Sequence, residues 1–379
     1  MRIEMYNRIV DGDQITMQRI GVTEKATDIT LTDTLYGQGD FDFTMALGAP
    51  YSDVIEIGTI IRADGYYWGV VTGTVRQESA GGATVEATGL ELKAWLASSR
   101  IVVPKDYTST DGTAGYDTAN GYTDAVVKHF WDNNLIAPTQ VPRKIPGVVW
   151  AGDDNIGIAD DKYMSRFESL ADVTAELCEA AKIGYRAEID VDTGIITVGC
   201  FAGVDRTETQ AKASRAIFSI SRGNISDISY DLDRAGYANA FYTTRSGAEF
   251  ADEALTMLYF RDDMEVSGWD RRETWNEISV PEPVSGTEYD EMKKQAEKKM
   301  ESAKEDESYT CSILRNAGYR TRWNVGDTVT VKWEREGVTA DMQVTEVSTS
   351  QDDNGTDYTV KFGDAKPKII SVRRRIIMI

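Results

Sequence analysis

Two stretches far apart in the chain carry the same alternation of apolar and polar residues, and they restrict the fold more than any other feature. They are Val54–Val75 and Trp323–Val347. Each approaches a glycine, Gly58 or Gly326, runs apolar at alternate positions, turns at a glycine-containing tip and returns as a second apolar strand. A period of two places successive side chains on opposite faces of a sheet, so both stretches predict β-hairpins.

An isolated hairpin is barely stable in water, so each of these hairpins must join a larger sheet. We therefore predict two related β-barrel or sandwich modules in one chain, with Gly58 and Gly326 as their paired structural markers. Coincidence is the alternative, because strand–turn–strand sequences are common. Neither stretch contains residues typical of a catalytic site.

The composition is that of an ordinary globular protein with room for two or three domains in 379 residues. No apolar run reaches the length of a membrane span, and the N-terminal residues lack the apolar core of a signal peptide. Cys178, Cys200 and Cys311 are too few and too far apart for a disulfide framework, which fits a reducing compartment.

The net charge of −21 argues against a protein that binds nucleic acid by neutralising phosphates. One interpretation of the acidity is solubility. The other is a passage through which DNA slides without sticking. The charge alone leaves both open.

The first expected domain, residues 1–102, is almost entirely β and ends in a short helix at Leu90–Ala97. Regularly spaced short strands separated by turn residues indicate a barrel or sandwich. We predict strands at Met1–Tyr6, Ile15–Thr23, Ala26–Thr34, Asp40–Leu47, Thr59–Ala63, Tyr67–Val75 and Gly82–Gly89.

Residues 103–215 predict a small α/β domain that opens with a long surface loop, Pro104–Tyr122. A helix capped by Thr123 follows, and Ser165 with Glu168 forms a capping-box pattern before a second helix that Gly184 ends. Tyr185–Asp190 and Ile195–Phe201 then predict a hairpin.

Residues 216–379 return to β and make the second expected barrel, with an inserted helix at 287–305. The fold class predicted is thus α+β and mainly β, with two tube-like modules flanking the α/β domain. Strands are expected at Ile217–Ser221, Ile225–Asp231, Ala238–Thr243, Leu255–Phe260, Arg272–Ser279, Tyr358–Phe362 and Lys368–Ile379.

Candidate catalytic and metal-binding residues are weakly supported. His129 is the sole histidine and lies beside Phe130 and Trp131, which favours a structural role. No Cys or His pair has metal-ligand spacing, and no phosphate-binding loop is present. We therefore expect no catalytic residue, cofactor or metal.

Acidic residues are plentiful, so a glycosidase pair is not excluded by composition. The doublets have turn or surface neighbours, and two short acidic runs resemble calcium loops without the distal glutamate. The doublets are Asp153-Asp154, Asp160-Asp161 and Asp262-Asp263; the runs are Asp190, Asp192 and Gly194, and Asp352, Asp353, Asn354 and Asp357. Turns and solvated edges are the favoured interpretation of all of them.

Arg373, Arg374 and Arg375 form the one basic run, just before an apolar tetrad at Ile376–Ile379. The run is a possible docking site for an acidic partner, and a frayed tail is the alternative.

With these features the chain resembles the siphophage tail-tip family, which includes minor tail and baseplate-hub proteins. The residues that carry the resemblance are Leu92–Pro104, Val325–Val331 and Val360–Lys368, and it covers essentially the whole chain. Many relatives continue into a receptor-binding or wall-degrading region, whereas this sequence stops at Ile379, so an enzymatic tip is expected to be another protein.

The resemblance implies a structural hub in a phage or prophage tail and no enzymatic activity. Hubs of this family are homotrimers whose paired modules match a six-fold tail tube to a three-fold tip. The implied partners are the distal tail and tape-measure proteins, with DNA passing unbound through an acidic channel. The implied location is the virion tail, assembled in the bacterial cytoplasm.

The alternative function is a cell-wall glycan-binding or glycan-hydrolysing tail protein that acts through carboxylates. Tyr66, Tyr67 and Trp68 would then form an exposed sugar-binding platform. We favour a buried sheet face for these aromatic residues. A metal-dependent peptidase is poorly supported, because the chain has one histidine and no HExxH motif.

Overall fold

The computed structural model describes residues 1–12, 14–105, 107, 115–246, 255–279, 292–293, 296–297, 299–300, 302–314, 317–352, 355–363 and 366–367. The chain forms two compact units, Met1–Ser229 with Thr310–Ile379, and Tyr230–Tyr309. The fold is α+β and mainly β, as the sequence predicts.

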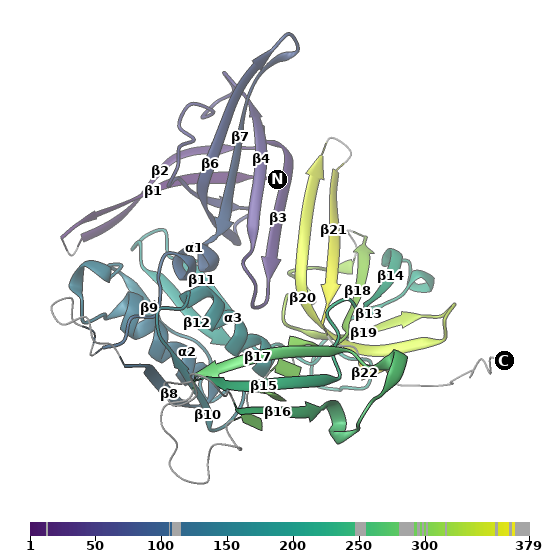
Figure 1. Ribbon diagram of the computed structural model, residues 1–379. Coiled ribbons are helices and arrows are strands. Elements are labelled where there is room, and N and C mark those ends of the chain that lie inside the picture. The colour runs from purple at the N-terminus through teal and green to yellow at the C-terminus, as the bar shows by residue number, and fades with distance from the viewer. Residues whose placement is uncertain are drawn as a thin grey trace. The chain divides into compact units, whose positions relative to one another are not determined.

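The first sheet module lies in the N-terminal part of the larger unit (Figure 1). Its strand order is β3-β4-β7-β6-β5-β1-β2, with antiparallel neighbours throughout. The hairpin predicted at Val54–Val75 is confirmed, with Ile60 opposite Val70. The strands are β1 (Ile3–Asp11), β2 (Gln14–Thr23), β3 (Thr27–Thr34), β4 (Asp40–Ala46), β5 (Ile60–Ala63), β6 (Tyr67–Ser79) and β7 (Gly82–Glu91).

The second sheet module contains the hairpin predicted at Trp323–Val347, which is confirmed with Val331 opposite Ala340. Its strand order is β14-β18-β21-β20-β19, with β13 parallel to β19 and β22 on β20. The strands are β13 (Ile217–Phe218), β14 (Ile225–Asp233), β18 (Asp306–Ile313), β19 (Thr328–Trp333), β20 (Val338–Asp352), β21 (Gly355–Phe362) and β22 (Lys366–Pro367).

The two modules share a strand order. The run β3-β4-β7-β6-β5 of the first corresponds, strand for strand along the chain, to β14-β18-β21-β20-β19 of the second. In each, two neighbouring strands are followed by a crossing to the far edge and then by two hairpins. The modules depart at the next strand, because β1 runs antiparallel to β5 whereas β13 runs parallel to β19.

A helical layer and a small sheet lie between the modules along the chain. The predicted hairpin of this region is confirmed as β11 and β12, and β9 joins it in parallel. The elements are α1 (Leu92–Ser98), β8 (Asp117–Gly121), α2 (Thr123–Trp131) with a π-helical turn at Asp132–Ile136, η2 (Val141–Arg143), β9 (Val148–Trp150), β10 (Asp161–Ser165), α3 (Leu170–Ala181), β11 (Gly184–Ile189) and β12 (Ile196–Phe201).

The helix boundaries differ from the predicted ones. Ser165 does not cap α3; its hydroxyl donates to Glu168, and Ser169 caps the helix by accepting from the Asp172 amide. Lys182, in the left-handed region at φ 55°, ends α3 where Gly184 was expected to. Thr123 lies inside α2 because its hydroxyl is already bonded to Asp161.

The loop predicted at Pro104–Tyr122 was also partly wrong, because β8 lies within it and pairs with β10. Its sequence, DTANG, has no apolar alternation, and Ala119 is its one buried apolar side chain. The start of α1 moves from Leu90 to Leu92, since β7 pairs with β6 through Glu91.

The smaller unit, Tyr230–Tyr309, contains a sheet of its own in the order β16-β15-β17. The helix predicted at 287–305 lies largely outside the described residues; Met292 and Ala296 have helical backbone there and are buried. The unit therefore holds more than the inserted helix alone. Its strands are β15 (Ala240–Ser246), β16 (Leu255–Phe260) and β17 (Glu273–Ser279).

Among the described residues of the larger unit, buried clusters fill the first module and the helical region. One fills the first module with Ile29, Leu31, Phe41 and Phe43 among others. The second joins α1, α2 and α3 to the β11–β12 hairpin around Trp131. Among the helices of the described residues, none is long and apolar enough to cross a membrane.

Candidate functional site

The turns at Gly58 and Gly326 have the same backbone conformation. Gly58 has φ +91° and Gly326 has φ +94°, values in the left-handed region that favours glycine. The Thr59 amide donates to the Glu56 carbonyl at 3.1 Å, and the Asp327 amide donates to the Asn324 carbonyl at 3.2 Å. Each turn therefore closes in the same way.

The residue after each glycine caps its own turn. The Thr59 hydroxyl accepts from the Glu56 amide at 3.2 Å, and the Asp327 carboxylate accepts from the Asn324 amide at 2.9 Å. Gly58-Thr59 and Gly326-Asp327 thus form the same kind of turn, capped by a hydroxyl in the first and by a carboxylate in the second.

Both turns are also bonded to their sheets identically. The Gly58 amide donates to the Val71 carbonyl at 2.8 Å, and the Gly326 amide donates to the Val344 carbonyl at 2.8 Å. In both strands a β-bulge follows at once, between Val71 and Gly73 in β6 and between Val344 and Glu346 in β20. Bulges are positional features of a sheet, so their coincidence strengthens the correspondence between the modules.

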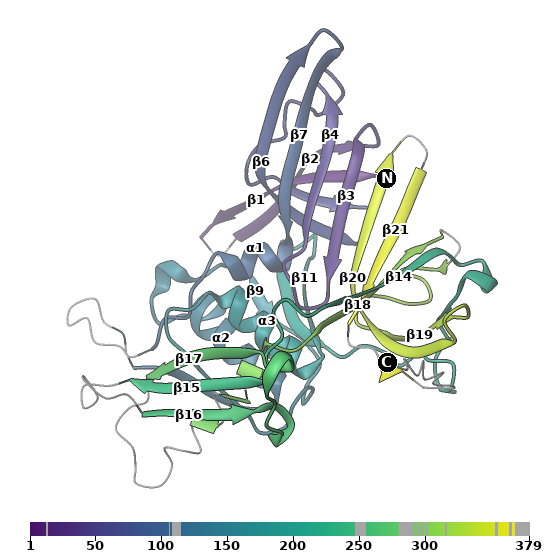
Figure 2. The ribbon, with the colours of Figure 1, turned by 45° about the vertical axis from the view of Figure 1, so that its right-hand side comes forward.

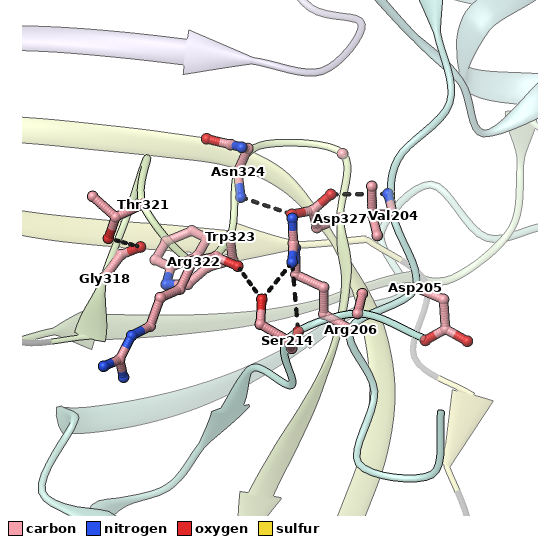
Figure 3. Close-up of polar contacts among 12 residues, drawn as sticks. Val204, Asp205, Arg206, Ser214, Gly318, Thr321, Arg322, Trp323, Asn324 and Asp327 are labelled. Carbon is pink, nitrogen blue, oxygen red and sulfur yellow. Dashed lines mark hydrogen bonds and ion pairs between the residues drawn. The ribbon is translucent and has the colours of Figure 1, made fainter. Parts of the chain in front are cut away.

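The Asp327 side chain also bonds to a segment outside its own turn, which the Thr59 side chain does not do among the described residues. Its carboxylate accepts from the Val204 amide at 2.9 Å and from Arg206 Nε at 2.5 Å, as Figure 3 shows. Arg206 also donates to the Ser214 hydroxyl at 2.7 Å. The carboxylate therefore fixes the segment that leads from β12 to β13 against the start of β19.

The two modules meet along one antiparallel strand pair, β3 with β20 (Figure 2). Glu346 lies opposite Thr34 and Gln351 lies opposite Ile29. The Leu35 amide extends the pairing by donating to the Thr345 carbonyl at 2.8 Å, at the bulge of β20. One sheet consequently runs from β14 through both modules to β2.

A cluster of charged and aromatic side chains reinforces this junction. Asp33 of β3 accepts from the Tyr319 hydroxyl at 2.7 Å and forms an ion pair with Arg320. The Arg320 guanidinium lies 4.4 Å from the ring centre of Tyr66, a cation–π contact. Tyr319 and Arg320 precede β19, so this cluster joins the second module to the first.

The groups around Arg320 favour its charged form. Burial opposes the charge of Arg320, but the carboxylate of Asp33 and the neighbouring tyrosines raise the pKa of the guanidinium above its ordinary value. Burial also raises the pKa of Tyr66 to about 12, against the opposing effect of Arg320. Tyr66 and Tyr319 therefore remain neutral, while the Arg320 guanidinium stays charged.

A second buried pair, Lys93 with Glu91, lies at the C-terminal end of β3, the strand that carries Asp33. Lys93 on α1 is 2% exposed, donates to the Thr34 carbonyl and lies 3.5 Å from the Glu91 carboxylate. Its ammonium also lies 5.0 Å from the ring centre of Tyr185. Burial raises the pKa of Glu91 to about 8, while Lys93 opposes that shift.

The face of the first module opposite its core is acidic. Along β4, Phe41, Phe43 and Met45 enter the core, so Asp40 and Asp42 lie on the other face. Burial raises the pKa of Asp42, and the carboxylates of Glu86, Asp40 and Asp28 raise it further. Carboxylates from neighbouring strands therefore share one polar face.

The structure places His129 in a local hydrogen-bond group. His129 Nε2 lies 2.7 Å from Asp117 Oδ1, and Asn133 Nδ2 donates to Asp117 Oδ2 at 3.1 Å. The group links α2 to β8, and among the described residues Asp117 and Asn133, with no serine or cysteine, are the hydrogen-bond partners of the ring.

Of the described acidic doublets and runs, Asp160 lies in a turn, whereas Asp161 begins β10 and Asp352 and Asp357 lie in β20 and β21. Asp153 accepts from the Ala202 amide at 3.0 Å, and Asp190 accepts from the Asp192 amide at 2.8 Å inside the β11–β12 turn. Asp262 occupies a single 3-10 turn with φ 55°. No group of His, Cys, Asp or Glu among the described residues could hold a metal ion.

Two further predicted sites have different outcomes. Tyr67 and Trp68 are 2% and 5% exposed, so they face the protein interior and form no sugar platform. The run Arg373, Arg374 and Arg375 lies outside the described residues, as does the strand predicted at 368–379.

The junction cluster was missed from the sequence, although a signal for it exists. Tyr319 lies seven residues before Gly326, and Tyr51 lies seven residues before Gly58. Both tyrosines follow a short Ala-containing turn, Ala317-Gly318 and Ala49-Pro50. An alignment of the two stretches extended to their N-terminal sides would have paired these tyrosines.

One sheet thus passes through two modules of matching strand order. A family model described as "Siphovirus ReqiPepy6 Gp37-like protein" matches residues 6–364. The chain belongs to this siphovirus tail protein family. None of the curated proteins searched matches the sequence.

Solved structures of phage tail proteins share the fold. The 43 kDa tail protein of prophage MuSo2 from Shewanella oneidensis is 15% identical, with a TM-score of 0.52, over 96% of this chain and 98% of that one. The tail protein from Neisseria meningitidis MC58 is 13% identical, with a TM-score of 0.50, over 95% of this chain and 96% of that one. By family and fold the chain is a phage-tail structural protein.

Proposed function

We propose that the chain is the trimeric hub of a phage or prophage tail, and that it adapts a six-fold tube to a three-fold tip. The observation that carries the proposal is the repeated strand order, together with the matching turns at Gly58 and Gly326. A chain with two equivalent modules presents six such modules when three copies surround an axis. A six-fold neighbour then meets six similar surfaces.

In this proposal the modules are copies of one ancestral sheet, and the domain limits near residues 102 and 215 mark where one copy ends and the other begins. The proposed partners are the distal tail protein on the six-fold side and the tape-measure protein within the tube. The docking role of Arg373–Arg375 belongs to the same proposal, as a basic run facing an acidic neighbour.

The acidic sheet face of the first module supports the second part of the proposal, a channel through which DNA passes. Asp40, Asp42 and Glu86 share this face; burial raises the pKa of Asp42, and the neighbouring carboxylates add to that shift. Phosphates are repelled from such a surface, so the DNA slides without binding. The net charge of −21 for each chain acts in the same direction.

The proposal assigns the protein a mechanical role without enzymatic activity. The buried rings of Tyr67 and Trp68 remove the aromatic platform on which the glycan alternative depended. Incubation with peptidoglycan is expected to release no sugars and to give no co-sedimentation. Release of reducing sugars would favour the alternative.

The oligomeric state tests the proposal directly. Light scattering coupled to size-exclusion chromatography is expected to give three times the chain mass of 42.0 kDa. The measurement is repeated over a range of protein concentrations, because association follows mass action. A stable dimer, or a monomer at every concentration, would contradict the hub.

A further inference from the structure

The outer half of β6 is an exposed strand edge whose counterpart in the second module is covered. Residues 346–351 of β20 pair with β21 on one side and with β3 on the other. The matching residues of β6, 73–79, pair with β7, and no described strand lies on their other side. An unpaired edge presents backbone amides and carbonyls to any strand of matching geometry.

Apolar side chains are exposed on this strand and on the segment that leads to the Gly58 turn. Tyr51 is 43% exposed, Ile57 is 72% exposed and Val75, on β6, is 53% exposed. Val325, the counterpart of Ile57 just before the glycine, is only 7% exposed. Tyr319, the counterpart of Tyr51, packs against Tyr66 and Asp33 at the β3–β20 junction. The first module thus has a β6 edge that matches the β20 edge of the β3–β20 junction, but no described strand covers it.

The other half of such a junction is present at the far end of the sheet. Strand β14 ends the sheet, and no described strand pairs with its second edge. Ser226-Asp227-Ile228-Ser229 of β14 repeats the pattern of Thr27-Asp28-Ile29-Thr30 in β3, the strand that covers β20. Since β14 also holds the position of β3 in the strand order, it is the second module's equivalent of the covering strand.

A surface hollow lies beside this edge of β14. Its lining includes Ile220, Ser226 and Ile228 and the tip of the β19–β20 hairpin, Trp333–Glu336. In the junction within the chain, Tyr319 packs against the corresponding elements, β3 and the tip of the β5–β6 hairpin at Tyr66. The hollow therefore lies beside the second module's equivalents of the two elements that Tyr319 contacts.

We propose that the partner of both edges is a second copy of this chain. The outer half of β6 in one copy pairs antiparallel with β14 of the next copy, and Tyr51 of the first copy fills the hollow between β14 and Trp333. The β3–β20 junction is the template, with Glu78 at the place of Gln351 and Ile228 at the place of Ile29. The proposal rests on the trimeric hub and identifies the contact between copies that closes the ring of three chains.

The contact is heterologous, because two different surfaces meet, and such contacts close into a ring only at a fixed number of copies. Each chain supplies one junction internally and one to its neighbour. Three chains then complete six junctions of one kind. The exposed edge and the exposed apolar residues of the first module are both covered in this ring.

Cysteine cross-linking tests the strand pairing. The variant Glu78→Cys/Ile228→Cys places one thiol on each edge, and mild oxidation of the full chain is expected to give a covalent trimer. A disulfide within one chain is excluded, because six strands separate β6 from β14 in the sheet, roughly 30 Å at the usual strand spacing, against a Cα limit of about 7 Å. Partner positions 227 and 229 are scanned with 228 to locate the register.

The controls are matched to this variant. Each single cysteine variant is expected to give no covalent oligomer, as is Glu86→Cys/Ile228→Cys, whose first thiol lies on β7, one strand inside the edge. The native thiols Cys178, Cys200 and Cys311 are buried and contribute no background. A dimer formed by a single variant would indicate a two-fold contact and overturn the proposal.

A second variant tests the hollow. Tyr51→Arg is expected to abolish the trimer, whereas Tyr122→Arg, at another exposed tyrosine, is expected to leave it intact. Unchanged thermal unfolding of both monomers separates assembly from folding. A trimer that persists in Tyr51→Arg, or that gives no cross-link at positions 227–229, would overturn this contact and leave the hub standing. Absence of any trimer in the unsubstituted chain would overturn the hub itself.

Discussion

The outer halves of β6 and β20 occupy the same position in two sheets of matching order, and they differ chiefly in what covers them. In β20, Glu346–Thr349 alternate between part-buried and buried because β3 lies alongside, and exposed residues appear only from Ser350 onward. In β6 the residues from Val75 onward are exposed. The comparison shows that the outer half of β20 is paired on both edges within the chain, whereas the outer half of β6 is paired with β7 alone among the described strands.

The same contrast extends to the turns. Gly326 lies in a packed environment, where an added Cβ would meet Phe201 at 2.9 Å and Leu35 at 3.1 Å. At Gly58 an added Cβ would meet nothing within 4 Å. The two glycines share a conformation and differ in surroundings, as expected if the space around Gly58 is filled only on assembly.

The largest expected effect separates these two glycines. Gly58→Ala is expected to lower the free energy of unfolding by about 1 kcal/mol, the cost of a left-handed alanine. Gly326→Ala is expected to cost about 3 kcal/mol, because contact with Phe201 adds overpacking to that cost. Urea unfolding of both variants measures the difference. Equal losses would show that the surroundings of the glycines are alike.

The next effect concerns the ion pair that binds the modules within the chain. Asp33→Ala leaves Arg320 and the Tyr319 hydroxyl without their acceptor and is expected to cost about 2 kcal/mol of stability. Asp40→Ala, on the acidic face of the same sheet, is the matched control and is expected to change stability by less than about 0.5 kcal/mol. Chemical denaturation compares them. Similar losses would contradict the role of Asp33.

A third effect, smaller per pH unit than the losses above, is the pH dependence that Glu91 gives to the same region. Burial raises the pKa of Glu91 from its ordinary 4.5 to about 8 in the folded protein. The folded state therefore holds this proton more tightly than the unfolded chain. The stability that the group contributes is present below pH 4.5 and is lost as the pH rises through about 8.

Glu91→Gln is expected to flatten the stability profile across that window. The unsubstituted protein should lose up to about 1.4 kcal/mol per pH unit from this proton, and the variant should lose correspondingly less. Urea midpoints measured from about pH 5 to about pH 8 provide the comparison. Parallel profiles would show that Glu91 titrates in its ordinary range.

The smallest expected effect tests the acidic face. Burial and the neighbouring carboxylates raise the pKa of Asp42, so its charged form destabilises the folded state. Asp42→Asn is expected to raise stability at neutral pH by about 0.5 kcal/mol, while Thr44→Asn on the same strand serves as the control. Thermal unfolding at neutral pH measures the gain. A loss of stability in Asp42→Asn would contradict mutual repulsion on this face.

The sequence predicts the two hairpins well, because alternation along Thr328–Trp333 and Tyr67–Val75 is a direct consequence of a half-buried sheet. It failed at β8, where Asp117 is buried through hydrogen bonds to His129 and Asn133 and no apolar pattern marks the strand. It also misplaced the cap of α3, since Ser165 and Ser169 both satisfy the cap pattern and only tertiary contacts distinguish them.

The candidate site was harder to predict, because its residues are distant in sequence. Asp33 and Arg320 are separated by 287 positions, and neither carries a local motif. Gly58 and Gly326 could be identified from the sequence, because a left-handed turn requires glycine at a fixed place before a strand. What surrounds each glycine depends on strand pairing between modules, which alternation alone does not encode.

The most direct test of the account is a cryo-electron microscopy map of the assembled protein, resolved well enough to trace strands. The account predicts a closed ring of three chains in which the β6–β14 contact between copies superposes on the β3–β20 junction within each copy. A ring in which the outer edge of β6 faces solvent, or in which copies meet through other surfaces, would contradict it.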